Sequence, residues 1–417
     1  MAPRRRTAAA LLVALASLAG CRGEDSEVGE PRITEAQAPE AGASGAGANP
    51  LFVAPGSRDF SDNPELLERI LASPHGYFRF INIPFSREVC RRFGVSVQGT
   101  PPFNLHGDAH LEQYAVTDLG RGLTDFDDSS TGPAVVDLLR FGVSLELACH
   151  GLPCSVEVDR IYKQFLRGYE TALDDPLTEA PEPAVVGRLR QEFSFDREAY
   201  FEWIASVMEP MPEAERRELV DARTPYVEAM LAQDASLGPR YFEPIAMGYL
   251  RMGIGSALDL KYLVRIRGAS DDPLDDVVLE VKQVRELGEI DCIAVARGSD
   301  PFRILVGQSR IAYQPYGLLG YLRMREKTFW IHAWVENYQE LGIEDDMVTP
   351  DELAEVAYDV GVQLGRGHPN QIGAPLDLQL RREQMRLLAR DRELVQRQRH
   401  ELAELVIEAW KRFRESV

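Results

Sequence analysis

Two acidic motifs in the first third of the chain carry side-chain types that could move a proton and hold a metal ion. Asp108 lies within the segment 106–110 (His-Gly-Asp-Ala-His), and Asp125 begins the segment 125–128 (Asp-Phe-Asp-Asp). A carboxylate such as Asp108 can accept a proton from an attacking hydroxyl group, while one such as Asp125 can bind a divalent metal ion against phosphate oxygens. These are two of the parts that phosphoryl transfer needs. A loop stabilised by local side-chain hydrogen bonds is the alternative for residues 106–110.

A glycine-containing turn and a lysine follow much later in the chain. Residues 253–256 (Gly-Ile-Gly-Ser) could form a tight loop whose backbone approaches phosphates, although a plain β-turn would give the same pattern. Lys282 lies about one strand further on, where a protein kinase places its phosphate-contacting lysine. Within that strand, Leu279 and Val281 should face one side, and Glu280 and Lys282 the other.

These groups must be positioned by a chain that changes from helices to strands and back to helices. Apolar spacing and Pro or Gly signals predict helices over 63–71, 86–93 and 132–149 and further helices from 158 to about 235. The chain is expected to be helical again from 350 onward, with one or two long helices over 377–416. Two short strands are expected at 116–119 and 122–126. An antiparallel meander of about five strands is expected over Leu260–Arg267, Val277–Val284, Phe302–Val306, Ile311–Tyr316 and Thr328–Val335. The pattern indicates an α+β protein.

Composition excludes several classes of protein. The 417 residues are 45% hydrophobic and 27% charged, which is enough apolar material for a sizeable core and for two or three domains. The net charge of −20 argues against nucleic acid as a partner and against attraction to anionic lipid head groups. Five cysteines in this length exclude a disulfide scaffold. Cys149 and Cys154 could close a small disulfide loop, and buried free thiols are the alternative.

The N-terminus indicates export. Arginines at 4–6 precede an apolar run at 8–19 that is too short to span a bilayer stably, which is typical of a secretory signal. The segment 18–21 (Leu-Ala-Gly-Cys) resembles the lipobox of bacterial lipoproteins, which implies cleavage before Cys21 and acylation of its thiol. An ordinary signal peptide is the alternative. Because Arg22 rather than an aspartate follows, we expect a lipid anchor in the outer membrane, facing the periplasm or the surface.

Taken together, the motifs resemble a bacterial family called domain of unknown function 2252, which is itself kinase-like and distantly similar to aminoglycoside phosphotransferases. The resemblance covers about residues 65–400. The matching segments are His106 to His110, Asp125 to Asp128, Gly132-Pro133, Asp137 to Arg140, Gly253 to Ser256, Leu279 to Lys282, Gly307 to Arg310 and Gly365 to His368.

The resemblance implies a circularly permuted protein-kinase-like fold, because the acidic motifs precede the glycine loop and the lysine. Geometry rather than chain order defines a site, so permutation need not disturb it. The expected organisation is a lipoprotein signal peptide (1–20), a flexible tether (21–56), a helical large-lobe region (57–240), an antiparallel-sheet region like a small lobe (241–345) and C-terminal helices that complete the large lobe (346–417).

The resemblance also implies roles and cofactors. Asp108 would be the catalytic base, and Lys282 would contact the phosphates of ATP. Magnesium would be held by Asp125 and Gln113. The residues expected to bind the nucleotide through the glycine loop are Gly253, Gly255 and Ser256. The expected supporting residues are His106, His110, Asp127, Asp137 and Arg140.

Three departures from the family pattern argue against activity. Gln113 replaces an asparagine, and its extra methylene moves the carbonyl oxygen by about 1.5 Å, which octahedral Mg²⁺ tolerates poorly. Leu258 replaces the third glycine of the loop, and Gln283 replaces a carboxylate beside the lysine. A protein exported from the cytoplasm also meets little ATP.

Three functions therefore remain open. The first is an exported lipoprotein with a kinase-like domain of unknown substrate that is non-catalytic or binds a nucleotide or phosphate. The second is an active Mg-dependent phosphotransferase that acts on a small hydroxyl substrate. The third is a metal-dependent hydrolase in which His106, Asp108 and His110 converge on zinc together with Asp125. The first two depend on Lys282 reaching the acidic motifs.

Overall fold

The computed structural model describes residues 49–60, 64–94, 96–97, 102–250, 259–288, 290–295 and 300–417. Several expectations lie outside the described residues: the signal peptide with Cys21, most of the tether, and Gly253, Gly255, Ser256 and Leu258. The described residues all belong to one compact unit, residues 48–417. Within the part of the chain that the structure describes, no helix is both long enough and apolar enough to cross a bilayer.

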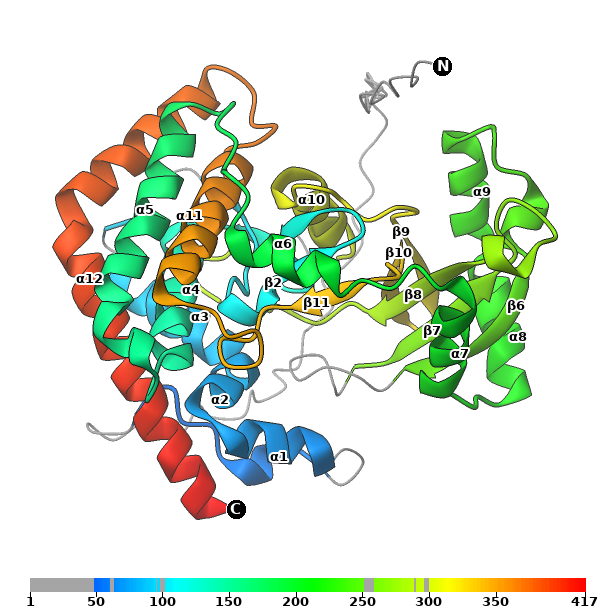
Figure 1. The fold of residues 1–417 in the computed structure, drawn as a ribbon, viewed down its shortest axis with the longest axis horizontal. Coiled ribbons are helices and arrows are strands. Elements are labelled where there is room, and N and C mark those ends of the chain that lie inside the picture. The colour runs from blue at the N-terminus through cyan, green and yellow to red at the C-terminus, as the bar shows by residue number, and fades with distance from the viewer. Residues whose placement is uncertain are drawn as a thin grey trace, which may run out of the picture. The chain divides into compact units, whose positions relative to one another are not determined.

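Helices supply the first and last parts of the described chain (Figure 1). They are α1 (Pro64–Ala72), α2 (Pro74–Phe80), α3 (Asn82–Phe93), α4 (Val135–Ala148), α5 (Val158–Asp174), α6 (Ala184–Gln191), α10 (Phe302–Ile311), α11 (Pro350–Gly367) and α12 (Leu376–Ser416). α5 packs on α11 with their backbones in contact, because glycines stand at the interface. A Cβ atom at Gly361 would lie 2.1 Å from the carbonyl oxygen of Phe165, and one at Gly168 would lie 2.2 Å from that of Tyr358.

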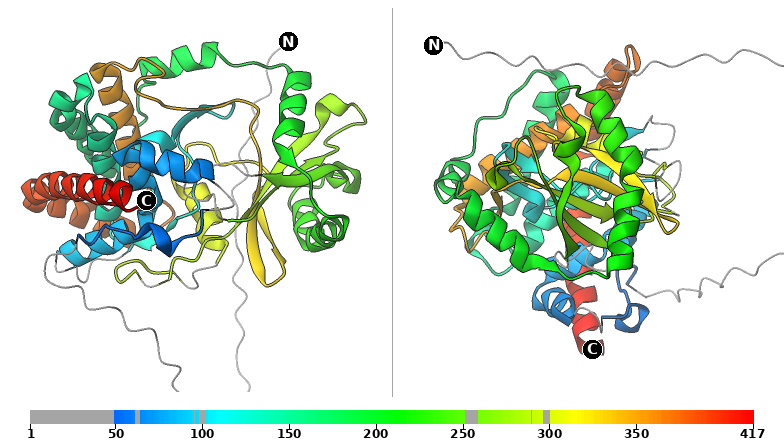
Figure 2. Two further views of the ribbon diagram at one scale, coloured as in Figure 1. Left: turned by 90° about the horizontal axis from the view of Figure 1, so that it is seen from below. Right: turned by 90° about the vertical axis from the view of Figure 1, so that its right-hand side faces the viewer.

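A six-stranded antiparallel sheet forms around a second core, with its strands in the order β5-β6-β7-β8-β10-β9. They are β5 (Met208–Glu209), β6 (Pro244–Leu250), β7 (Lys261–Ile266), β8 (Val277–Gln283), β9 (Gly320–Met324) and β10 (Lys327–Ala333). The helices that cover it are α7 (Arg197–Val207), α8 (Glu213–Ala222) and α9 (Thr224–Gln233). Leu279 and Val281 share a core with α8 and α9, whereas Val278 packs with α7, so alternate residues face opposite sides as predicted. Figure 2 shows the green helices of residues 197–233 beside the sheet.

Two small antiparallel sheets carry the acidic motifs. Their strands are β1 (Phe103–Leu105) with β4 (Ser130–Gly132), and β2 (Tyr114–Thr117) with β3 (Arg121–Leu123) and β11 (Tyr338–Glu340). Residues 106–110 follow β1, and residues 125–128 connect β3 to β4. Because Leu105 at the end of β1 lies opposite Ser130 at the start of β4, the sheet brings the two motifs to the same place.

The predicted α+β class is confirmed, but two of the five expected meander strands are wrong. Phe302–Val306 and the first residue of Ile311–Tyr316 lie in helix α10. Ile304, Gln308 and Ile311 are buried there at the helical spacing of four and three, and a short apolar run does not distinguish a strand from a buried helix. In their place, β5, β6 and β9 complete the sheet, and none of these three was predicted.

The two cores do not correspond to two continuous stretches of the chain. Tyr226 and Met230 of α9 belong to the core of the six-stranded sheet, although they lie within the region expected to be the helical lobe. Conversely, Ile304 and Ile311 of α10 belong to the helical core, although they lie within the expected sheet region. Amphipathic spacing predicts that one face of a helix is buried, but it does not show against which core that face packs.

Four cysteines form two disulfides in the described chain. Cys149 is joined to Cys154, which was one of the two alternatives left open. Cys90 of α3 is joined to Cys292 in the segment after β8, and this pair was not predicted. Their Cα atoms are 5.4 Å apart although 202 positions separate them, so no local spacing indicates the pairing.

Candidate functional site

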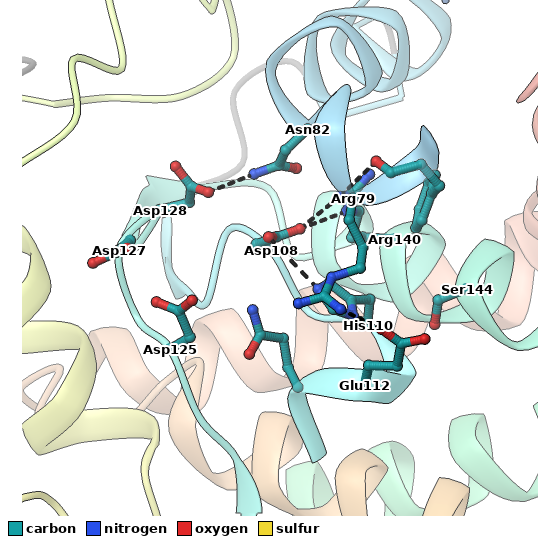
Figure 3. Close-up of polar contacts among 12 residues, drawn as sticks. Arg79, Asn82, Asp108, His110, Glu112, Asp125, Asp127, Asp128, Arg140 and Ser144 are labelled. Carbon is teal, nitrogen blue, oxygen red and sulfur yellow. Dashed lines mark hydrogen bonds and ion pairs between the residues drawn. The ribbon is translucent and has the colours of Figure 1, made fainter. Parts of the chain in front are cut away.

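The two acidic motifs contact each other because glycine stands at position 107. Gly107 has a φ of +84°, and a Cβ atom there would lie 1.9 Å from the carbonyl oxygen of Asp128. Glycine alone meets both demands. Asn82 of α3 then joins the motifs, since its Nδ2 donates to the carbonyl oxygen of Gly107 at 3.0 Å and to Oδ2 of Asp128 at 2.9 Å. Figure 3 shows Asp108 beside the three aspartates of residues 125–128.

Asp137 of α4 holds the backbone of the first motif. Its carboxylate accepts the N–H of His106 at 2.7 Å and the N–H of Gly107 at 2.9 Å, and it is fully buried. Nε2 of His368 lies 3.1 Å from the same carboxylate. Although burial opposes it, the hydrogen bond from His368 lowers the pKa of Asp137. Asp137 therefore stays ionised and positions the loop rather than exchanging protons.

Asp108 is buried and paired with Arg140 of α4. Oδ1 of Asp108 lies 2.6 Å from Nη2 of Arg140 and accepts from its Nε at 2.8 Å. The guanidinium also stacks on Phe78, with its central carbon 3.7 Å from the ring centre. Burial raises the pKa of Asp108 to about 7, although Arg140 opposes the shift. A carboxylate with such a pKa suits general base chemistry near neutral pH.

The raised pKa of Asp108 predicts that the protein loses stability as pH rises from 5 to 7. The folded state binds a proton that the unfolded chain has released above about pH 4, so the stabilisation is complete at low pH and is lost as pH passes through the folded pKa. Asp108→Asn should remove about 2 kcal/mol of this change. Urea unfolding of both proteins at pH 5 and pH 7 measures it, and equal changes would contradict the raised pKa.

The zinc cluster considered from the sequence is not formed. Nε2 of His106 lies 2.9 Å from the carbonyl oxygen of Thr124, and its Nδ1 accepts the N–H of Asp108 at 3.3 Å, so both ring nitrogens are engaged. Nε2 of His110 lies 3.8 Å from Oδ2 of Asp108. Among the residues described by the structure, no three His, Cys, Asp or Glu side chains are grouped to hold a metal ion. Metal-dependent hydrolysis stays a prediction, without a preformed cluster of ligands at these residues.

Lys282 of β8 reaches the second acidic motif. Its Nζ lies 2.9 Å from Oδ1 of Asp125 and 2.5 Å from Oδ2 of Asp127. Oδ1 of Asp127 accepts from Nε1 of Trp330 at 2.8 Å. Both carboxylate oxygens of Asp127 are thus engaged, while the side chain of Asp125 keeps 34% of its surface exposed. The six-stranded sheet and the acidic loop therefore meet through a two-carboxylate ion pair.

The two carboxylates on Lys282 have opposite pKa shifts. Burial and the charge of Asp125 raise the pKa of Asp127 to about 7. Although burial opposes it, the charge of Lys282 lowers the pKa of Asp125. Asp125 also has a φ of +53°, a region that residues other than glycine seldom adopt, and such strain is typical of functional sites. Asp125 is therefore the charged and accessible member of the pair.

Gln113 lies next to Asp125 through the backbone. It ends the short 3₁₀ helix η2 (Leu111–Gln113), and its carbonyl oxygen accepts the N–H of Thr124 at 2.8 Å. Thr124 directly precedes Asp125, so the two residues expected to hold magnesium come from neighbouring backbone segments.

Sequence reasoning missed several cations and one histidine at this site. Nη1 of Arg285 lies 3.0 Å from Oδ2 of Asp128, and Nη1 of Arg303 donates to the carbonyl oxygen of Ser129 at 3.0 Å. Nε2 of His332 lies 2.9 Å from Oε2 of Glu280. The residues omitted from the expected set are the buried Asn82, Lys261 and His332 and the half-buried Glu280, Arg285 and Arg303. A single arginine or lysine in a charge-rich chain cannot be recognised from sequence as part of a site. Strand alternation did predict that Glu280 lies on the same face as Lys282.

A pocket of 610 Å³ adjoins the ion pairs. It is lined by Lys261, Glu280 and Leu250 of the sheet, and by the segment 334–340 that leads from β10 to β11. Trp203 of α7 also lines it. This volume lies within the range of small-molecule and cofactor sites. The charged side chains in the lining are one lysine, Lys261, and four glutamates at 192, 280, 336 and 340.

The comparisons with known proteins cover part of the chain. A model of a family described as uncharacterized proteins conserved in bacteria, domain of unknown function 2252, matches residues 63–243. No curated protein and no solved structure matches the chain. The matched stretch contains Asp108, Asp125 and Arg140 and ends before Lys282, so it bears out the expected resemblance for the acidic motifs.

Proposed function

We propose that this chain is an exported, lipid-anchored protein whose kinase-like site binds the phosphate groups of a magnesium nucleotide. The observation that carries the proposal is the contact of Lys282 with Asp125 at 2.9 Å, between residues 157 positions apart. A kinase needs a strand lysine and a metal-binding aspartate at one phosphate site. The lipid on Cys21 would hold the protein at the outer membrane, facing the periplasm or the surface.

The order of strands supports a permuted kinase-like arrangement. β6 and β7 are connected through residues 251–258, which include the expected glycine loop, and Lys282 follows on β8, the third strand counted from β6. Protein kinases also carry this lysine on their third strand, after the glycine loop. The difference is that the aspartate motifs precede the sheet in the chain, and permutation leaves such a site intact when the geometry is kept.

The donor groups suit a magnesium ion. Mg²⁺ prefers oxygen ligands and is usually held by one or two carboxylates together with substrate phosphates. Asp125 is ionised and one-third exposed, whereas Asp127 is occupied by Lys282 and Trp330. Asp125 would therefore hold the ion, with Gln113 as the neighbouring oxygen ligand. A bound magnesium ion would neutralise charge on the phosphate oxygens.

Phosphoryl transfer to a small hydroxyl substrate is the second candidate function. The specific observation in its favour is the pKa of Asp108, which burial raises to about 7. Such a group is partly ionised at neutral pH and can accept the proton of an attacking hydroxyl group. Arg140 and Asp137 would keep the carboxylate and its loop in place.

Thermal unfolding with MgATP tests nucleotide binding. At a ligand concentration one hundred times Kd, binding should stabilise the full chain by about 2.7 kcal/mol and raise its Tm. Asp125→Asn should remove most of this shift, because it removes the charged oxygen ligand for magnesium. Glu228→Gln, an exposed residue of α9, loses the same charge and should keep the shift. A wild-type Tm that does not move at millimolar MgATP would overturn the proposal.

A further inference from the structure

The pocket of 610 Å³ carries an excess of negative charge. Its lining sets four glutamates against a single lysine, Lys261. Lys261 already has interaction partners within the protein, and the charges of Glu280 and Asp125 act on it. The chain as a whole has a net charge of −20, so its field also favours positively charged ligands. The pocket therefore suits a cation rather than an anion.

Two of the four glutamates are engaged by side chains that do not line the pocket. Oε2 of Glu280 lies 2.9 Å from Nε2 of His332. Oε2 of Glu336 lies 3.0 Å from Nη1 of Arg197. The other oxygen of Glu336, Oε1, is buried and has no hydrogen-bond partner among the described residues. Buried acceptors in folded proteins nearly always find a donor, so this oxygen points to a donor that comes with a ligand.

The other two glutamates, Glu192 and Glu340, come from different segments of the chain. Glu192 directly follows α6, and Glu340 ends β11. In the parts of the chain that the structure describes, neither forms an ion pair with a basic side chain. A ligand with one positive charge would leave one of these two carboxylates unpaired. The lining therefore favours a ligand that carries two or more ammonium groups.

Aromatic rings form a further part of the wall. Trp203 of α7 is 43% exposed, and its ring centre lies 5.4 Å from that of Trp334. Tyr338 lines the pocket as well and is also exposed. Arg197 lies over the ring of Phe201 at 4.8 Å in the same helix as Trp203, but no described arginine or lysine lies over the three pocket rings. Open aromatic faces beside carboxylates are suited to organic ammonium groups.

We infer that the pocket binds an organic polyamine, a flexible molecule with two or more ammonium groups on an apolar chain. The ammonium groups pair with Glu192 and Glu340, and the methylene groups pack on the rings of Trp203 and Trp334. Among the described residues, the aspartates and the lysine of the proposed nucleotide site do not line this pocket. The inference therefore goes beyond the proposed function and does not depend on it.

Titration calorimetry with spermidine tests the inference on the full chain at pH 7, in about 0.15 M sodium chloride to screen exposed charges. Glu192→Gln with Glu340→Gln should weaken spermidine binding about tenfold, because two partly exposed ion pairs are lost. Trp203→Leu keeps an apolar side chain without the aromatic face and should weaken binding about threefold. Hexane-1,6-diol, which has a similar chain and no charge, should not bind measurably to wild type.

A charge-matched double variant separates this pocket from the acidic surface in general. Glu198→Gln with Glu228→Gln removes two exposed charges outside the lining and should bind spermidine as wild type does. Equal weakening in the two double variants would overturn the inference, because the whole surface would then attract spermidine. It is also wrong if wild type does not bind millimolar spermidine, or binds the diol equally well. Both double variants should unfold at the wild-type Tm, since the exchanged side chains form no ion pairs among the described residues.

Discussion

Replacing Lys282 with methionine is expected to lower the free energy of unfolding by about 3–5 kcal/mol at pH 7, the usual cost of breaking a buried ion pair from one side. Methionine has a similar volume but no charge, so it leaves the buried carboxylate of Asp127 without its cation. Asp125, which keeps a third of its surface exposed, is affected less. Urea unfolding measured by circular dichroism gives the value.

Part of the stability lost in Lys282→Met should return when the unpaired negative charge of Asp127 is also removed. In Lys282→Met with Asp127→Asn, the neutral amide can still accept the hydrogen bond from Trp330, and about half of the lost stability should return. Lys163→Met on the surface of α5 should change stability by no more than about 0.5 kcal/mol. A loss below about 1 kcal/mol in Lys282→Met would show that the ammonium group does not bridge the two aspartates in solution.

Arg140→Met is expected to have an equally large effect, through the first acidic motif. Arg140 is fully buried and pairs with Asp108, and Nη2 also donates to the carbonyl oxygen of Phe78 at 3.1 Å. The variant should lose about 3–5 kcal/mol at pH 7, because a buried carboxylate is left unpaired. The missing cation should also raise the pKa of Asp108 above 7, so the loss should shrink as the pH is lowered toward 5.

Two further variants serve as controls for Arg140→Met. Arg160→Met removes an arginine that is 42% exposed and pairs with Glu157 on the surface, and it should cost no more than about 1 kcal/mol. Arg140→Met with Asp108→Asn should lose the part of the pH dependence that Asp108 contributes, since position 108 no longer carries a carboxyl group. An Arg140→Met protein whose stability loss is the same at pH 5 and pH 7 would rule out the buried pair as the cause.

The amino-acid sequence indicated the parts of the site that are carried by motifs. Asp108, Asp125 and Lys282 were selected through residue types and spacing, and the contact between Lys282 and Asp125 is the one that the kinase-like interpretation required. Strand alternation also predicted correctly that Leu279 and Val281 face away from Lys282. These signals are short and periodic, so one sequence is enough to reveal them.

The rest of the site depends on pairings over long distances, which leave no local signal. Lys261 lies opposite Lys282 only because β7 and β8 pair in one particular register. Asn82 contacts Gly107 and Asp128 only because α3 packs beside both motifs. The helix α10 was mistaken for strand because its apolar run is short and ambiguous. In each case the contact or the secondary structure is determined by tertiary packing, which the local sequence pattern does not show.

The disulfide between Cys90 and Cys292 closes a covalent ring that contains both acidic motifs, Arg140 and Lys282. A ring of 202 positions removes loop entropy equivalent to about 5 kcal/mol from the unfolded chain. The acidic motifs and Lys282 therefore remain tethered even when the molecule is denatured, and reassembly of the site is an intramolecular search. Material produced in a reducing cytosol would lack this tether, so preparations from oxidising and reducing hosts would be physically different proteins.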